Sequence, residues 1–217
     1  IVFPVDEGSY RAPDEITVPG DISSAAYWVV AATLIPGSDL LLKNVGINPT
    51  RTGLLDVMKA MGADITLLDE RLSGHEPVAD LRVKSALLHG VSFGASLMPR
   101  LIDEIPVLAA AALFADGDTI MTGAGELRVK ETDRLHAIAV EYNRVAPGSV
   151  EERPEGLVVH GKAALRFATV SSWADHRMAM ALSVIGAAGD GVEIKEPDCV
   201  GISYPAFYET LEALRKS

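Results

Sequence analysis

The chain has 217 residues, of which 48% are apolar and 23% charged, as in an ordinary folded globular protein. Its net charge of −11 argues against a nucleic-acid surface, which needs a basic patch, so we expect no nucleic-acid partner. A lone cysteine indicates a reducing compartment. No apolar run reaches the roughly 18 residues of a membrane span, so we expect no membrane segment. The five histidines lack metal-ligand spacing, so we expect no metal site.

The first segment, residues 1–13, precedes any regular pattern. It has no initial methionine and no signal-peptide pattern, so we interpret it as the tail or crossover of an upstream domain. Residues 14–217 are then expected to form one domain.

Three segments of that domain share one plan: an aspartate, an apolar helix rich in small residues, a glycine turn and a short strand. They read GDISSAAYWVVAATLIPGSDLLL, IDEIPVLAAAALFADGDTIMT and ADHRMAMALSVIGAAGDGVEI. The leading aspartates are Asp21, Asp103 and Asp175. The turn glycines are Gly37, Gly117 and Gly189. This internal repeat predicts three equivalent structural units.

A second, amphipathic helix is expected 14 residues beyond each turn glycine (51−37, 131−117 and 203−189). These helices start at Arg51, Glu131 and Ser203. Strand-like stretches follow the first two, including residues 63–70, 80–84 and 156–161. The unit is therefore βαβαββ, and three units predict an α/β domain. Its first helices are apolar on nearly every side, which predicts that they are buried in the middle.

Each buried helix begins at a polar or charged cluster. Helix N-termini carry unpaired N–H groups and the positive end of the helix dipole. A threefold arrangement that points these ends the same way brings them to one face and creates an anion site. For the stretch GDISS, we favour capping of the helix by Asp21, Ser23 or Ser24 over direct contact with a ligand.

The stretch RVKETDR, residues 128–134, crowds cations and carboxylates together. We expect Glu131 to open a helix on which Lys130 and Arg134 share a face, with Asp133 paired to either of them. By itself this pattern fits a salt-bridged helix start equally well. The clusters DE (103–104) and DHR (175–177) at the mouths of apolar helices favour a site instead, because isolated charges are costly where burial begins. Such a set suits an anionic substrate and a proton transfer.

Five motifs make the chain resemble the 5-enolpyruvylshikimate-3-phosphate (EPSP) synthase family. They are PGDISSAAYW, LIDEIPVLAAAALFADG, ELRVKETDRL, DHRMAMAL and SYPAFYETL, in the order of the family. The resemblance covers essentially the whole chain and implies the C-terminal half of a two-domain inside-out barrel, with three βαβαββ units in each domain and substrates in the cleft. It implies transfer of the enolpyruvyl group of phosphoenolpyruvate to the 5-hydroxyl of shikimate 3-phosphate, without metal or organic cofactor. The implied location is the bacterial cytoplasm, or a plastid.

The resemblance also implies roles for individual residues. Asp103 would contact the 5-hydroxyl as a base, and Glu131 would move a proton at the phosphoenolpyruvate methylene. Arg134 and Arg177 would clamp phosphoenolpyruvate. The residues assigned to substrate binding as a whole are Lys130, Arg134, His176 and Arg177.

Ile202 departs from the family pattern, because many members have a lysine there. The family's N-terminal motifs, which bind the phosphate of shikimate 3-phosphate, are not in this sequence. We therefore expect the chain to need a complementary N-terminal domain or chain, to be inactive alone, and to bind phosphoenolpyruvate or the inhibitor glyphosate weakly at best. Two alternatives stay open: a UDP-N-acetylglucosamine enolpyruvyl transferase-like enzyme, and a non-catalytic assembly module.

Overall fold

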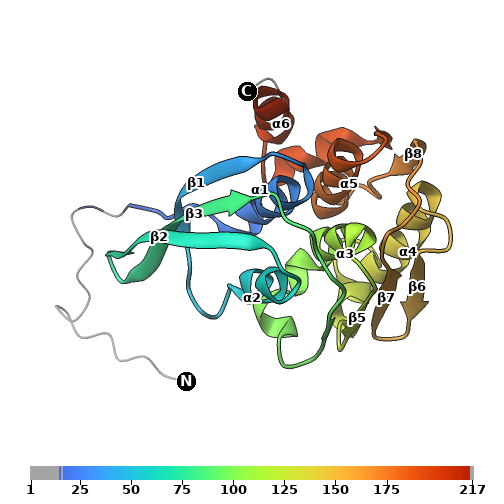
Figure 1. Cartoon of the computed structure of the whole chain (residues 1–217), viewed down its shortest axis with the longest axis horizontal. Helices are drawn as coiled ribbons and strands as arrows, with labels where there is room; N and C mark the ends of the chain where they lie inside the picture. Colours follow the sequence, from blue (N-terminus) through green and yellow to red (C-terminus); the bar gives the residue numbers. More distant parts are fainter. Residues whose placement is uncertain (1–14, 16, 216–217) are drawn as a thin grey trace, which may run out of the picture.

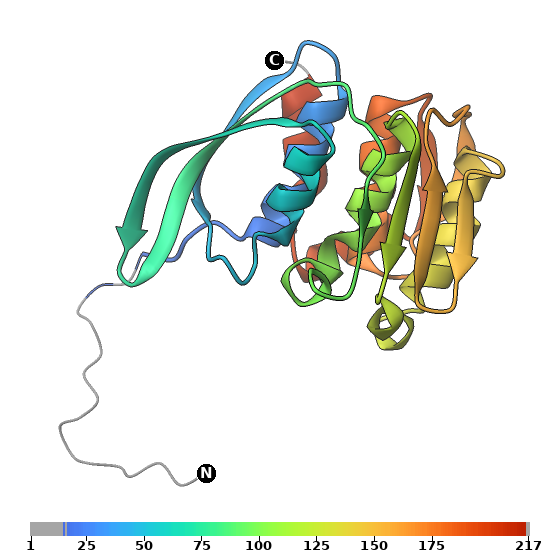
Figure 2. The same cartoon turned by 60° about the horizontal axis from the view of Figure 1, so that its bottom comes forward.

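A computed structural model of the chain describes residue 15 and residues 17–215. Residues 1–13, which we interpret as the tail of an upstream domain, lie outside the described residues. The described part is an α/β domain in which helices pack against three small sheets (Figures 1 and 2). No helix in this part is long and apolar enough to cross a lipid bilayer.

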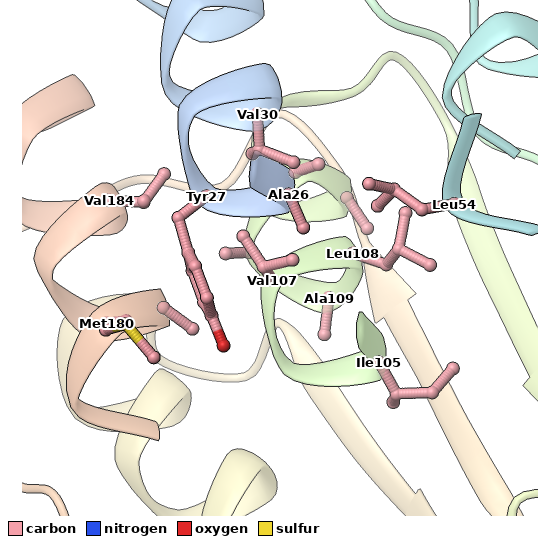
Figure 3. Packing of buried hydrophobic residues seen from close by; sticks show 14 of the residues in the cluster. Ala26, Tyr27, Val30, Leu54, Ile105, Val107, Leu108, Ala109, Met180 and Val184 are labelled. Atoms are coloured by element: carbon pink, nitrogen blue, oxygen red, sulfur yellow. The ribbon is translucent and has the colours of Figure 1, made fainter. Parts of the chain in front are cut away.

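Three apolar helices form the centre of the domain. They are α1 (Ile22–Leu34), α3 (Ile105–Phe114) and α5 (His176–Ala188), and each contacts the other two. Tyr27 of α1, Val107 of α3 and Val184 of α5 point into their common interface (Figure 3). The many alanines let the backbones approach closely, and each large apolar side chain buried there contributes roughly 1.5–3 kcal/mol. The prediction that these helices are buried is confirmed.

The first sheet is antiparallel and has the strand order β1-β3-β2. Its strands are β1 (Asp39–Gly46), β2 (Asp64–Ser73) and β3 (Glu76–Lys84), and helix α2 (Gly53–Ala60) packs against β2. A parallel bridge joins Gly20, just before α1, to Val45 of β1. The buried side of β3 carries Ala79, Leu81 and Val83, which attach the sheet to the core.

The second sheet has the order β4-β5-β7-β6. Its strands are β4 (Ser92–Phe93), β5 (Asp118–Thr122), β6 (Val150–Arg153) and β7 (Gly156–His160). Strand β5 pairs in parallel with β4 and antiparallel with β7. Helix α4 (Arg134–Val145) contacts β6 and β7, so the second unit places its helices against this sheet.

The third sheet has two parallel strands, β8 (Ala168–Ser171) and β9 (Val192–Lys195), and precedes helix α6 (Phe207–Arg215). Four short 3-10 helices complete the described part. They are η1 (Met98–Arg100), η2 (Ile102–Glu104), η3 (Gly125–Val129) and η4 (Pro197–Ile202).

The second helices begin later than the sequence pattern predicted. Helix α4 begins at Arg134 instead of Glu131, because the Asp133 side chain accepts a hydrogen bond from the N–H of His136 and caps the helix there. Helix α6 begins at Phe207, and Pro205 explains the delay, since it disfavours helical backbone at the residue before it.

The sequence pattern also assigned the third turn to the wrong glycine. Gly189 ends α5 with a φ of −119°, so it is not a left-handed residue. The left-handed position of that turn is Gly191, with a φ of 88°, which matches Gly37 and Gly117 at 80° and 92°. A glycine adopts such angles without steric cost, and a neighbouring glycine makes the sequence ambiguous.

Candidate functional site

The N-termini of the three central helices meet at one point. Ser23 in the first turn of α1 donates a hydrogen bond of 2.5 Å to Glu104, which stands directly before α3. Arg177 at the start of α5 places its Nη1 atom 3.8 Å from the same Glu104 oxygen. The prediction that these helix ends converge is therefore confirmed.

The three leading aspartates do not behave alike. Asp21 accepts hydrogen bonds from the N–H groups of Ser23 and Ser24, and Asp175 accepts one from Arg177, so both cap their helices. Asp103 lies one residue further from its helix, inside η2, and makes no capping bond. Its carboxylate faces cations instead of helix N–H groups, so it is not needed as a helix cap.

Arg134 holds three carboxylates together from beneath the site. Its side chain is completely buried. The Nε atom donates to Asp175 at 2.7 Å, Nη1 to Asp103 at 3.1 Å, and Nη2 to Glu131 at 2.6 Å. Asp175 is fully buried as well, so the Arg134–Asp175 ion pair lies beneath the other charged side chains and is enclosed by the protein.

Lys130 and Arg177 are the accessible cations around Asp103. The Lys130 ammonium lies 3.8 Å from Asp103 and 3.0 Å from Glu126, and Arg177 Nη2 lies 3.5 Å from Asp103. Their side chains are 26% and 17% exposed, against none for Arg134. An incoming anion therefore meets Lys130 and Arg177 before it meets Arg134.

The Asp103 carboxyl is balanced between burial and attraction. Burial opposes its ionisation, but Arg177, Lys130 and Arg134 outweigh that cost and lower its pKa. Asp103 is thus an ionised hydrogen-bond acceptor at neutral pH. A ligand that drew these cations away would raise the pKa of Asp103 and make it a stronger base.

This charge balance predicts a pH-dependent stability. A lowered pKa in the folded state stabilises the fold above the unfolded-state value, 3.8, and the contribution is lost as pH falls through the folded-state pKa. Asp103→Asn is therefore expected to melt below the wild type at pH 6, with the gap closing as the pH falls below the unfolded-state value of 3.8. Thermal unfolding of both chains across this range checks it; a gap that stays constant would contradict it.

His176 is the first residue of α5 and is 7% exposed. Burial lowers the pKa of its imidazole, so the ring is neutral at neutral pH. Its Nδ1 atom is buried and has no hydrogen-bond partner in the part of the chain that the structure describes. Buried polar atoms are rarely left unpaired, so this nitrogen is an unsatisfied hydrogen-bonding group beside the charged cluster.

The RVKETDR stretch begins at the end of η3 and then forms a loop, not a helix start, up to Asp133. Lys130 therefore does not share a helix face with Arg134; both converge on Asp103 through tertiary contacts. Asp133 pairs with Arg128 at 2.9 Å, which corrects the expected pairing with Lys130 or Arg134. Arg128 also bonds Glu152, and this attaches the loop to the β6–β7 hairpin.

Two buried carboxylates were not among the predicted site residues. Asp175 anchors Arg134, and Glu104 joins the three helix ends. The available signal was their position, since each is an acidic residue at the exact border of an all-apolar helix, where burial is costly without a partner. Ile202, where many EPSP synthases have lysine, is 74% exposed at the end of η4.

Comparison with known proteins identifies the family. The sequence pattern described as EPSP synthase (3-phosphoshikimate 1-carboxyvinyltransferase) matches residues 4–211. The 3-phosphoshikimate 1-carboxyvinyltransferase of Synechococcus elongatus is 52% identical over 92% of this chain and 44% of its own length. That of Gloeobacter violaceus is 54% identical over 93% of this chain and 46% of its own length.

Solved structures agree with the sequence comparison. EPSP synthase from Acinetobacter baumannii superposes with a TM-score of 0.87 and 39% identity, over 91% of this chain and 46% of that one. The enolpyruvyl transferase NikO from Streptomyces tendae, with a TM-score of 0.66 and 18% identity over 92% of this chain and 44% of its own, shares the fold. The chain spans about half the length of the relatives it matches, and it belongs to the EPSP synthase family.

Proposed function

We propose that residues 14–217 are the C-terminal domain of an EPSP synthase, built from three βαβαββ units, with residues 1–13 as the crossover from an N-terminal domain. Together the two domains transfer the enolpyruvyl group of phosphoenolpyruvate to the 5-hydroxyl of shikimate 3-phosphate and release phosphate. One observation carries the proposal: Asp103, Lys130, Glu131, Arg134 and Arg177 gather from three separate segments at the mouth of the buried helices.

This charge set fits the bonds that must change. The acceptor oxygen bonds to the central carbon of phosphoenolpyruvate while the methylene takes up a proton; the bond to phosphate then breaks and the methyl group returns a proton. A base is needed at the hydroxyl and an acid–base group at the methylene. Asp103 takes the first role and Glu131 the second. The developing positive charge at the central carbon is stabilised by their carboxylates.

The cations hold the anionic groups of phosphoenolpyruvate. Arg177 is accessible and offers the planar fork that matches a carboxylate or phosphate, whereas the Lys130 ammonium, 3.8 Å from Asp103, would lie near the hydroxyls of shikimate 3-phosphate. Arg134 joins Arg177 when Asp103 and Glu131 turn toward the substrates. This movement releases Nη1 and the Glu131 contact of Nη2, while Asp175 keeps Nε and a contact of 3.4 Å with Nη2. His176, whose buried Nδ1 is unpaired among the described residues, would supply a further hydrogen bond once its ring turns toward the substrate. Glyphosate, as a competing anion, would use the same cations.

The third sheet supports the need for a complementary domain. In the first two units, the strand after the buried helix, β1 or β5, pairs antiparallel with a later strand. The equivalent strand β9 pairs with β8 in the described residues. A cavity of about 590 Å³ lies beside it, lined by residues that include Val192, Ile194 and Tyr208. We expect the complementary domain to contribute the strands that this third sheet lacks and to cover the cavity beside β9. We propose the cytoplasm as the location of the assembled enzyme.

The complementation test is direct. This chain alone is expected to release no phosphate from phosphoenolpyruvate and shikimate 3-phosphate, because the proposed partner supplies the rest of the site. Adding a separately folded N-terminal half should restore phosphate release that depends on both substrates. The assembled halves should release no phosphate when UDP-N-acetylglucosamine replaces shikimate 3-phosphate as the acceptor. Turnover by the chain alone, or no turnover by two folded halves together, would contradict the proposal.

A further inference from the structure

Glu104 is a buried carboxylate directly beside Asp103, with 4% of the residue exposed. Its Oε1 atom accepts the hydroxyl hydrogen bond of Ser23 and lies 3.8 Å from Arg177 Nη1. The Ser23 oxygen also accepts a hydrogen bond of 3.0 Å from Arg51. Because Arg51 occupies an acceptor position of that oxygen, the single hydroxyl proton of Ser23 is directed to Glu104.

Arg177 is shared between two carboxylates of unequal freedom. Its Nη1 atom donates to the backbone oxygen of Asp103 at 3.4 Å and lies 3.8 Å from Glu104 Oε1, while Nη2 lies 3.5 Å from the Asp103 carboxylate. Asp103 is about one-third exposed and can turn toward a substrate hydroxyl. Glu104 is enclosed and tied to Ser23, so it keeps its place when Asp103 turns. Without it, Arg177 would lose its fixed counter-ion at the moment a substrate binds.

We propose that Glu104 is a positioning residue that holds the Arg177 guanidinium at the mouth of the site while Asp103 engages the acceptor. This inference rests on the proposed function, because it assigns Arg177 to phosphoenolpyruvate and Asp103 to shikimate 3-phosphate. It predicts that the loss of Glu104 affects one substrate and not the other.

The electrostatics separate this role from a stabilising one. The groups that face Glu104 are Ser23, Arg51, Asp103, Arg177 and the ring of Tyr27. Burial raises the pKa of Glu104, and Asp103 adds to this, against the opposing effects of Ser23, Arg177 and Arg51. Ionised Glu104, the form that acts as the counter-ion of Arg177, therefore contributes no stability to the fold, and a neutral side chain of the same shape should not weaken it.

Glu104→Gln in the assembled enzyme tests the proposal. We expect the KM for phosphoenolpyruvate to rise about tenfold, since a poorly oriented Arg177 loses roughly one good charge-assisted contact. The KM for shikimate 3-phosphate and the thermal midpoint should stay near those of the parent. Ser23→Ala, which frees Glu104 to move, should shift the same KM in the same direction by less. Glu212→Gln, an exposed glutamate of α6 paired with Arg215, serves as the isosteric control.

Three results would overturn the proposal: an unchanged KM for phosphoenolpyruvate, an equal rise for both substrates, or a loss of stability as the sole effect. If the parent enzyme releases no phosphate, the proposed function fails by itself. The side-chain ¹⁵N signal of Arg177 in this chain then decides the positioning role. A shift in Glu104→Gln but not in Glu212→Gln supports it, and no shift in either overturns it.

Discussion

Arg134→Met is expected to lower the free energy of unfolding of this chain by about 3–5 kcal/mol. The substitution keeps much of the apolar stem but removes the charge that three carboxylates share. Asp175 would then lie fully buried, keeping the helix N–H groups it caps but losing its cation. An uncompensated buried charge is among the most destabilising changes a single residue can cause. Urea unfolding followed by circular dichroism measures the loss.

A matched arginine on the surface provides the control. Arg128 also pairs with two carboxylates, Asp133 and Glu152, but those side chains are 37% and 30% exposed. Arg128→Met should therefore cost no more than about 1 kcal/mol, since water solvates the charges left behind. Arg134→Lys should fall between the two, because one ammonium cannot replace three separate N–H contacts. Equal losses for Arg134→Met and Arg128→Met would show that burial of Asp175 does not govern the effect.

The central helices were predictable because their signal is local. Alanine-rich stretches without a polar face, such as residues 105–114, have no stable place on a surface, and the aspartates before two of them are standard caps. The convergence of the helix ends followed from the repeat, and the contacts among Ser23, Glu104 and Arg177 confirm it.

The finer geometry of the site depends on long-range contacts that no local pattern contains. The repeat treats Asp21, Asp103 and Asp175 as equivalent, yet Asp103 lies in a 3-10 turn and faces cations, while the other two cap helices. The charges of the RVKETDR stretch fit several pairings equally well by spacing. The pairing of Asp133 with Arg128 is decided by the β6–β7 hairpin, where Glu152 lies next to the same arginine.

Burial was the hardest property to read from the sequence for the charged residues. Arg134 reads as an ordinary helix-surface arginine, but it is the most deeply enclosed cation of the site. The resemblance assigns it to phosphoenolpyruvate, and its three carboxylate partners now occupy the groups that would bind the ligand. The role in the clamp that we propose for Arg134 would therefore require Asp103 and Glu131 to move away from it when the substrates bind.

Glu131→Gln in the assembled enzyme is expected to lower kcat by about 10²–10⁴-fold, the usual worth of one general acid–base group. Glutamine keeps the shape and a hydrogen-bond acceptor for Arg134 but cannot carry the proton to and from the phosphoenolpyruvate methylene. Because the Glu131 side chain is half exposed and contacts Arg134 alone among its ion pairs with described residues, the fold should lose less than about 1 kcal/mol. Steady-state phosphate release and thermal unfolding of the same preparation measure the two effects.

Glu193→Gln is the matched control. Among the described residues, this exposed glutamate of β9 hydrogen-bonds only to Thr169, and it lies outside the cluster around Asp103 and Arg134. It should leave kcat unchanged. A near-normal rate for Glu131→Gln would instead favour the reading of this chain as an assembly module, with its charged loops serving an interface. Loss of rate without loss of stability would favour a catalytic role for Glu131. If Glu131 only held the two halves together, higher concentrations of the N-terminal half would restore the rate of Glu131→Gln. A deficit that persists at saturating partner places Glu131 in the proton transfer itself.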